Sequence, residues 1–312
     1  MRFSIRQPLP LPLVPSSIGR FSGRARAGRV MDYNTAIVLF GLLSTGLLLG
    51  GFGALVSLKG ENLTADVAGH GVVSGVVLSQ GVIVWFGLGT WLAVPVLWVL
   101  GFTSSALILC FIFFLRWRGY SVGASQALAI ALAYGSSLVL LSIVQATGAF
   151  STKGLTLLLL GDAAALTLGK VLPALMLLLV WGLAFLLLRR ALHDWVLDRH
   201  ASGLAGLQSR LDLVWAVATV ALVLSALPAL GLTLLVGMLT LPALIVRPWV
   251  TSFSRLVLGS ALIGGVVSGL AGWLSAGVLP LPTGALVVVS LGAVWALGSL
   301  AAGLRRKGVP AR

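Results

Sequence analysis

Long apolar runs separated by short polar segments make up most of the sequence. From Met31 onward these runs reach the roughly 20 residues that a helix needs to cross about 30 Å of hydrocarbon. They predict an all-α, polytopic membrane protein with eight or nine transmembrane helices. The expected spans are 34–58, 63–88, 91–115, 122–147, 170–190, 211–229, 232–246, 256–278 and 284–304.

One further apolar run, residues 154–168, is too short and interrupted to span a bilayer. It is expected to form a re-entrant or interfacial helix. The composition fits a packed helical bundle, because the chain is 59% hydrophobic, only 9% charged, and holds 39 glycines that allow helices to approach closely. Cys110 is the only cysteine, which excludes a disulfide within the chain and leaves the redox compartment open.

The basic residues predict an orientation. Lys and Arg are retained on the cytoplasmic side of a membrane. One of the two orientations places 13 of them inside and only Lys153 and Lys170 outside, with Met31 outside and a basic cytoplasmic tail at 305–312. The inside set is Lys59, Arg116, Arg118, Arg189, Arg190, Arg199, Arg210, Arg247, Arg255, Arg305, Arg306, Lys307 and Arg312. The net charge of +14 therefore reflects topology, and no basic face with interleaved aromatic residues indicates nucleic acid.

Residues 1–30 differ from the membrane domain at 31–304, since they carry six arginines and no acid. Three interpretations compete: a disordered basic tail, a targeting leader, or an upstream extension with the working start at Met31. The predicted orientation would leave these six arginines outside, and this favours the start at Met31.

An acid and an imidazole lie four residues apart in the second expected span, at Asp66 and His70. This spacing puts both side chains on one helix face. Such residues are costly in a membrane, and together they suit a divalent transition metal. At about 1.5 Å per residue from Lys59, His70 is expected roughly 16 Å along the helix, near the bilayer midplane. The alternative is that both residues only bond neighbouring helices.

Two other polar positions are candidates. Asp162, in the interrupted run, is either an entry residue that attracts cations or a helix N-cap. Residues 193–212 form the longest polar segment between spans and hold three of the seven acids. Residues 193–210 are expected to form a short amphipathic helix on the membrane surface that docks a cytoplasmic partner; the alternative is a solvated loop.

Four sequence motifs, which occur in the same order as in a known protein family, resemble the motifs of that family. Asp66-Val-Ala-Gly-His70-Gly-Val-Val-Ser74-Gly75 is similar to Asp-x-x-Ser-His-x-x-x-Pro-Gly, and the stretch from Asp198 to Gly206-Leu207 is similar to a cytoplasmic Asp-x-x-x-Ala-x-x-x-Gly-Leu element. Residues 230–243 and the pair 274–275 with 281–284 follow. The chain thus resembles the permease subunit of metal-uptake ABC transporters of the ABC-3 type, with departures at Gly69, Ser74 and His200.

This resemblance implies a transport subunit of the bacterial plasma membrane and not an enzyme. It implies import of a divalent metal ion (zinc, manganese or iron) by a homodimer in the lipid bilayer, with cytoplasmic ATPase subunits and an extracytoplasmic metal-binding protein. No permanently bound cofactor is expected. The implied metal residues are Asp66 and His70, with Asp162 a weaker candidate, and the implied ATPase-coupling residues are Asp198, His200, Gly206 and Leu207.

Two rival functions stay open. The chain has no phosphate-binding Gly-x-x-x-x-Gly-Lys-Ser/Thr loop, so ATP hydrolysis by that route needs another subunit. A secondary transporter of metal ions or protons would use Asp66 as its titrating group, although no internal repeat supports it. An ABC permease for a metal chelate would need no buried metal ligands. Carboxylate and imidazole serve zinc, manganese and iron alike, so the sequence leaves the metal undetermined.

Overall fold

Helices make up nearly all of the described chain in the computed structural model, which describes residues 33–146, 166–197, 205–277 and 281–307. In lipid, helices satisfy their own backbone hydrogen bonds, which is why uninterrupted apolar runs adopt this form. The elements are α1 (Tyr33–Lys59), α2 (Thr64–Phe86), α3 (Thr90–Trp117), α4 (Val122–Ala146), α6 (Leu168–Leu197), α7 (Ala205–Val246), η2 (Arg247–Trp249), α8 (Phe253–Gly277) and α9 (Thr283–Lys307).

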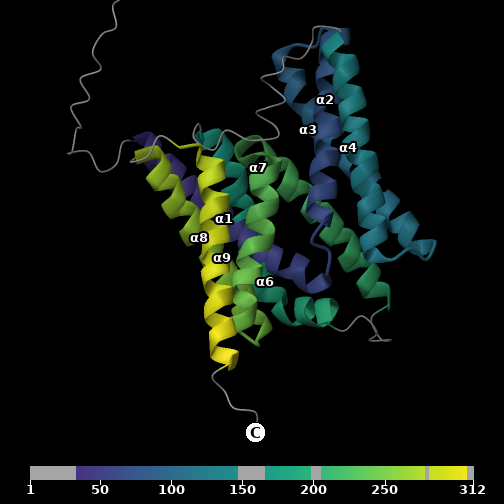
Figure 1. Cartoon of the computed structure of the whole chain (residues 1–312). Coiled ribbons are helices and arrows are strands. Elements are labelled where there is room, and N and C mark those ends of the chain that lie inside the picture. The colour runs from purple at the N-terminus through teal and green to yellow at the C-terminus, as the bar shows by residue number, and fades with distance from the viewer. Residues whose placement is uncertain (1–32, 147–165, 198–204, 278–280, 308–312) are drawn as a thin grey trace, which may run out of the picture. The chain divides into compact units, whose positions relative to one another are not determined.

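The nine predicted spans are confirmed within these described residues. Two of them lie in α7, at Arg210–Leu227 and Leu230–Trp249. They are separated at Gly231, whose φ of 73° and ψ of 163° interrupt the helix in a region that is essentially restricted to glycine. In Figure 1 the two parts of α7 meet toward the top of the view and both descend from there. Gly231 thus turns one continuous apolar run into two spans.

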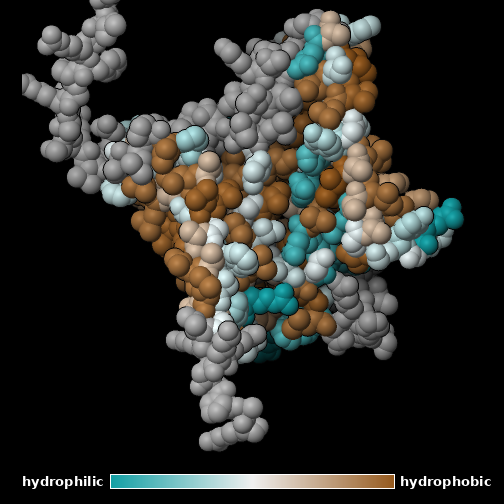
Figure 2. All heavy atoms as spheres, in the orientation of Figure 1, coloured by the Kyte–Doolittle hydropathy of each residue, from teal (hydrophilic) through white to brown (hydrophobic). Residues whose placement is uncertain are grey.

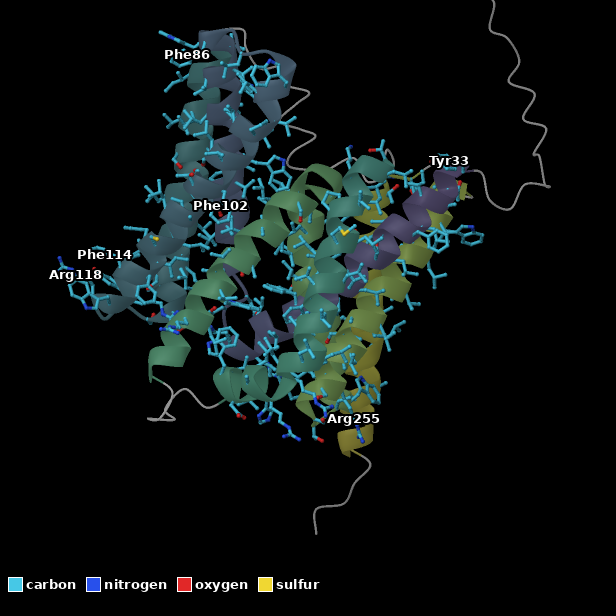
Figure 3. All side chains as sticks on the ribbon, turned by 180° about the vertical axis from the view of Figure 1, so that it is seen from behind. Tyr33, Phe86, Phe102, Phe114, Arg118 and Arg255 are labelled. Atoms are coloured by element: carbon cyan, nitrogen blue, oxygen red, sulfur yellow. The ribbon has the colours of Figure 1, made fainter. Side chains whose placement is uncertain are left out.

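The basic residues of the described spans lie mainly at one end of the helices, with Lys170 at the start of α6 as an exception. In Figure 3, Tyr33 and Phe86 lie toward one end, while Arg118 and Arg255 lie toward the other. We call the second the basic end and define it by Lys59, Arg116, Arg118, Arg210, Arg247 and Arg255. This grouping agrees with the charge asymmetry of the sequence, and the cytoplasmic placement of the basic end stays a prediction of the charge rule.

Two groups of helices share α7 as a common neighbour. Helix α1 packs against α6, α7 and α8, and α2 packs against α3, α4 and α7. The contact of α1 with α8 is very close: a β-carbon added at Gly46 would lie 2.4 Å from the backbone oxygen of Gly264. Because α7 contacts both groups, a displacement of α7 acts on α1 and α2 together.

Large apolar side chains cover much of the outer surface, as Figure 2 shows in brown. On α6, Leu186 and Leu187 are exposed, and on α9 Val289 and Leu297 are exposed. Such contiguous apolar exposure is expected where lipid surrounds the helices.

The polar segment at 193–210 differs from its prediction. Residues 193–197 continue α6 and residues 205–210 begin α7, so its described parts do not form a separate surface helix. The physical reason is that helical backbone hydrogen bonding continues from the apolar runs into the flanking polar residues, as far as Leu197 in α6 and from Ala205 in α7. In Figure 1 the last turns of α6 run across the lower end of the helices, close to the placement expected for a surface helix. Residues 1–30, the run 154–168 and Asp162 lie outside the described residues.

Candidate functional site

Asp66 and His70 lie on one face of α2, one turn apart, as their spacing predicted. Asp66 is in the first turn of the helix. Its Oδ1 lies 3.6 Å from Nε2 of His70, which is longer than a hydrogen bond of 2.7–3.2 Å. Two ligands held at about 2.1 Å from one tetrahedral ion lie about 3.4 Å apart. The separation of the two atoms fits a shared metal ion, and it also fits an ion pair between Asp66 and a protonated His70.

The imidazole is mostly buried and has one unused nitrogen. The side chains of His70 and Asp66 are 13% and 26% exposed. The ring of Tyr134 on α4 meets the His70 ring edge to face, with 5.2 Å between the ring centroids. Nδ1 of His70 is buried and makes no hydrogen bond to any described residue. Metal-binding histidines usually donate this second N–H to an acceptor that strengthens the ligand, so His70 is suited to weak and reversible binding.

Buried polar contacts fix α2 against its neighbours around this pair. The Ser105 hydroxyl of α3 donates to the backbone oxygen of Ala68 at 3.0 Å. From α4, the amide nitrogen of Gln126 donates to Oγ1 of Thr64 at 2.8 Å. These bonds lie immediately before and between the two candidate ligands, so the neighbouring helices hold the face that carries Asp66 and His70.

The predicted depth of His70 is wrong. The helix begins at Thr64, because residues 60–63 form a turn, so counting from Lys59 overstated the distance. At about 1.5 Å per residue, His70 lies about 9 Å from Thr64. The pair is thus nearer the basic end of α2 than the middle of this helix of 23 residues.

Packing accounts for two of the three departures from the family motifs, those at Gly69 and Ser74. A β-carbon at Gly69 would lie 2.1 Å from Cδ1 of Leu232 on α7, so the glycine leaves room for that leucine. A proline at position 74 would remove a helix hydrogen bond to His70. Ser74 keeps the helix intact and its hydroxyl lies 3.1 Å from the backbone oxygen of His70 and 3.3 Å from that of Ala133.

Among the described residues, no other predicted site residue joins this pair. Within the described residues, no group of three or more His, Cys, Asp or Glu side chains is placed to hold a metal. Asp162, Asp198 and His200 lie outside the described residues. Gly206 and Leu207 fall in the first turn of α7, where the backbone is helical.

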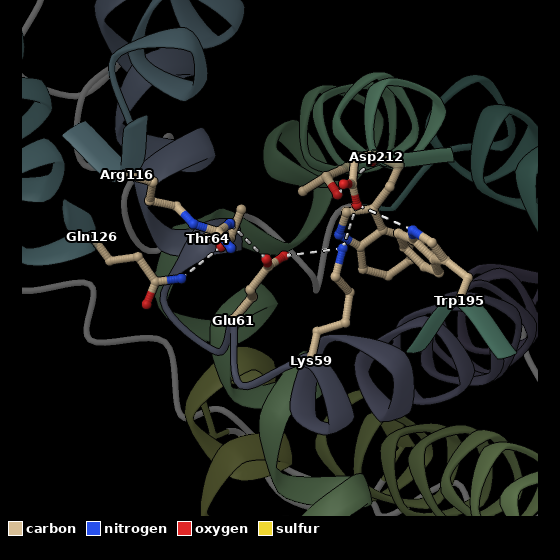
Figure 4. A network of polar contacts seen from close by, with 9 residues as sticks. Lys59, Glu61, Thr64, Arg116, Gln126, Trp195 and Asp212 are labelled. Atoms are coloured by element: carbon tan, nitrogen blue, oxygen red, sulfur yellow. Dashed lines mark hydrogen bonds and ion pairs between the residues drawn. The ribbon is translucent and has the colours of Figure 1, made fainter. Parts of the chain in front are cut away.

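A cluster of charged residues, which we call the charged cluster, lies at the basic end: Lys59, Glu61, Arg116 and Asp212. Figure 4 shows the contacts. The ammonium of Lys59 lies 2.9 Å from Oδ1 of Asp212 and 3.8 Å from Oε2 of Glu61. Arg116 donates to Oε1 of Glu61 at 3.1 Å. Two positive and two negative groups thus join α3, the turn before α2, the end of α1 and the start of α7.

The comparisons with known proteins agree with this arrangement of helices. The model of the ABC 3 transport family matches residues 31–302. The chain belongs to the ABC 3 transport family. It is therefore a transport permease of the membrane.

Two relatives are similar to this ABC 3 chain in sequence. It is 29% identical over 279 residues to the zinc transport system membrane protein TroC of Treponema pallidum (strain Nichols), covering 88% of this chain and 91% of TroC. It is 28% identical over 267 residues to the manganese transport system membrane protein MntC of Bacillus subtilis (strain 168), covering 82% of this chain and 58% of MntC.

The fold of the ABC 3 chain is similar to that of a protein whose structure has been solved. Its helices superpose on PsaBC from Streptococcus pneumoniae in complex with Fab with a TM-score of 0.71 and 16% sequence identity. The match covers 86% of this chain and 91% of that one. The likeness confirms the predicted fold of an ABC-3 type permease.

The charged cluster of this ABC 3 permease was missed by sequence reasoning, which used Lys59 and Arg116 only to orient the helices. Lys59 and Asp212 are separated by 153 positions in the chain, so no local spacing indicates their contact. The available signal was Glu61, an acid in the short turn between two spans of a chain with only seven acids. A buried acid at a membrane boundary needs a basic partner.

Proposed function

We propose that this chain is the permease of an ATP-driven importer of divalent metal ions, zinc or manganese foremost, and that Asp66 and His70 bind the ion during passage. The observation that carries the proposal is the 3.6 Å spacing of a carboxylate oxygen and an imidazole nitrogen on a membrane helix. The relatives named for zinc and for manganese transport support these cargo ions. Iron is a further candidate, because the same ligand types accept it.

Two copies of the chain would complete the metal site. One copy offers two ligands, whereas tightly held zinc takes four. A homodimer with its twofold axis beside α2 would bring together two carboxylates and two imidazoles around one pathway. The ligand set is then sufficient for capture, and the imidazoles with no acceptor on Nδ1 keep the affinity low enough for release.

The proposed complex contains two further kinds of subunit. Cytoplasmic ATPases would dock at the segment 193–210 at the basic end, with Asp198, His200, Gly206 and Leu207 as the coupling residues. A metal-binding protein outside the membrane would deliver the ion, with Asp162 as an entry residue. The family supports both partners, since its members are the membrane subunits of ABC transporters.

The test is uptake of radiolabelled zinc and manganese by proteoliposomes that contain the permease, its ATPase and its binding protein. We expect uptake only when ATP is supplied on the ATPase side, and competition between the two ions. Omission of the ATPase subunit is the matched control.

The two rivals predict other results in the same assay. Uptake that follows an ion gradient in vesicles without the ATPase would establish a secondary transporter and contradict the proposal. Uptake of a metal chelate, with no uptake of the free ion delivered by the binding protein, would establish a chelate permease and contradict it as well.

A further inference from the structure

We infer that the charged cluster couples the ATPase to the metal site. Lys59 is the residue through which movement of the proposed ATPase-docking segment 193–210, called the α6–α7 segment below, reaches α2. This inference rests on the proposed function and assigns a positioning role, since none of the cluster residues meets the metal. It starts from the observation that a residue of α6, Trp195, and a residue of α7, Asp212, both contact Lys59.

Both flanks of the α6–α7 segment are tied to Lys59. The indole N–H of Trp195, near the end of α6, donates to Oδ1 of Asp212 at 3.1 Å. The same carboxylate oxygen lies 2.9 Å from the ammonium of Lys59, and that ammonium lies 3.8 Å from the centre of the Trp195 ring. A displacement of either flank therefore moves the groups that hold the Lys59 ammonium.

From Lys59 the contacts continue to the start of α2. The Glu61 carboxylate lies between Lys59 and Arg116, and the backbone N–H of Thr64 donates to the Glu61 backbone oxygen at 2.9 Å. Thr64 is the first residue of α2, and Asp66 follows in the same turn. Four residues thus separate the cluster acid from the first candidate metal ligand.

The burial of the cluster makes it a stiff connection. The side chains of Lys59 and Glu61 are each only 8% exposed, so separating them would leave unpaired charges away from water. The contacted elements are therefore expected to move as one unit rather than slide past one another. The outer members are more accessible, with Asp212 at 47% and Arg116 at 37% exposure.

An aromatic stack supports the same connection from α1. The ring of Phe52 lies parallel to the Trp215 ring with 4.2 Å between centroids, and Trp215 in turn meets Trp195 at 5.3 Å. These contacts join α1, α6 and α7 beside the charged cluster. The charged cluster and the stack together give coupling a contiguous physical route, from the proposed ATPase-docking segment to the metal face.

The experiment compares Lys59→Met with Arg118→Met in proteoliposomes of the full complex, with metal uptake and ATP hydrolysis measured together. Methionine keeps an unbranched apolar stem and removes the charge. Arg118 is the matched control, because it also lies at the basic end and its guanidinium lies 5.4 Å from the Phe114 ring centre, but it is outside the cluster.

We expect Lys59→Met to retain ATP hydrolysis and to lower the metal imported per ATP by about tenfold, a typical size for coupling between two sites. Arg118→Met is expected to keep the wild-type ratio. A wild-type ratio in Lys59→Met, or an equal loss in Arg118→Met, would overturn the inference. If Lys59→Met does not assemble, Trp195→Phe replaces it, since phenylalanine retains an aromatic ring but loses the N–H donor together with the second ring of the indole; an unchanged ratio there overturns the inference.

The experiment distinguishes a failure of this inference from a failure of the proposed function. A wild-type complex that imports no metal with ATP contradicts the proposed function itself. A wild-type complex that imports metal, with the same ratio in the Lys59 variant, contradicts only the role of the charged cluster.

Discussion

Asp66→Ala and His70→Ala are each expected to reduce ATP-driven metal uptake to the background of empty vesicles, while the protein still assembles. Each change removes one of the two ligands whose atoms lie 3.6 Å apart on α2. Loss of a residue that merely orients a ligand lowers metal affinity about 10–100-fold, and loss of the ligand itself is expected to exceed this. Asp66 is short and 26% exposed, so its removal leaves no large cavity; because the His70 ring is mostly buried, the assembly of His70→Ala is checked by size-exclusion chromatography.

Ser105→Ala is the matched control for this pair. It also removes a polar side chain beside α2, one whose hydroxyl donates to Ala68, but it offers no strong metal ligand. The loss of such a hydrogen bond between membrane helices averages about 0.6 kcal/mol, so uptake should stay near the wild-type value. Undiminished uptake in both Asp66→Ala and His70→Ala would show that the pair is only structural.

Gly53→Ala is expected to have the largest effect on assembly. A β-carbon at this position of α1 would lie 1.8 Å from the backbone oxygen of Leu239 on α7, a distance that no side-chain rotation relieves. The two helices must separate, and overpacking of this kind costs about 1–3 kcal/mol or more. We expect a lower yield of folded protein in detergent and a lower melting temperature, both measured by size-exclusion chromatography after heating.

Gly135→Ala provides the comparison, since the same substitution on α4 meets nothing within 4 Å. Alanine is also the better helix former by about 1 kcal/mol. The melting temperature should therefore be unchanged or slightly higher. A Gly53→Ala protein as stable as Gly135→Ala would contradict the observed contact between α1 and α7.

The spans and their ends followed from the sequence because they depend on local hydropathy and charge. The apolar runs near residues 211–229 and 232–246 were predicted as two spans, and the structure interrupts the helix between them at Gly231. The shared helix face of Asp66 and His70 could also be predicted, because residues four apart lie on the same side of a helix. In each case the information lies within a few turns of one helix.

The features that escaped prediction depend on partners distant in the chain. The role of Gly69 is visible only once Leu232 of α7 is placed against it. The contact of Lys59 with Asp212 forms because α1 and α7 pack together, which hydropathy does not encode. The depth of His70 was wrong for a more local reason, the turn at 60–63, where a positive φ at Gly60 ends α1 before α2 begins.

The most direct test of the central claim is X-ray absorption at the zinc edge on the purified permease and ATPase complex, loaded with zinc in the absence of the binding protein. The account predicts a first shell of nitrogen and oxygen with imidazole scattering in the wild type. It further predicts that His70→Ala loses the imidazole contribution and most of the bound zinc, while Ser105→Ala retains both. Retention of the same imidazole signal and zinc content in His70→Ala would contradict the claim that Asp66 and His70 bind the transported ion.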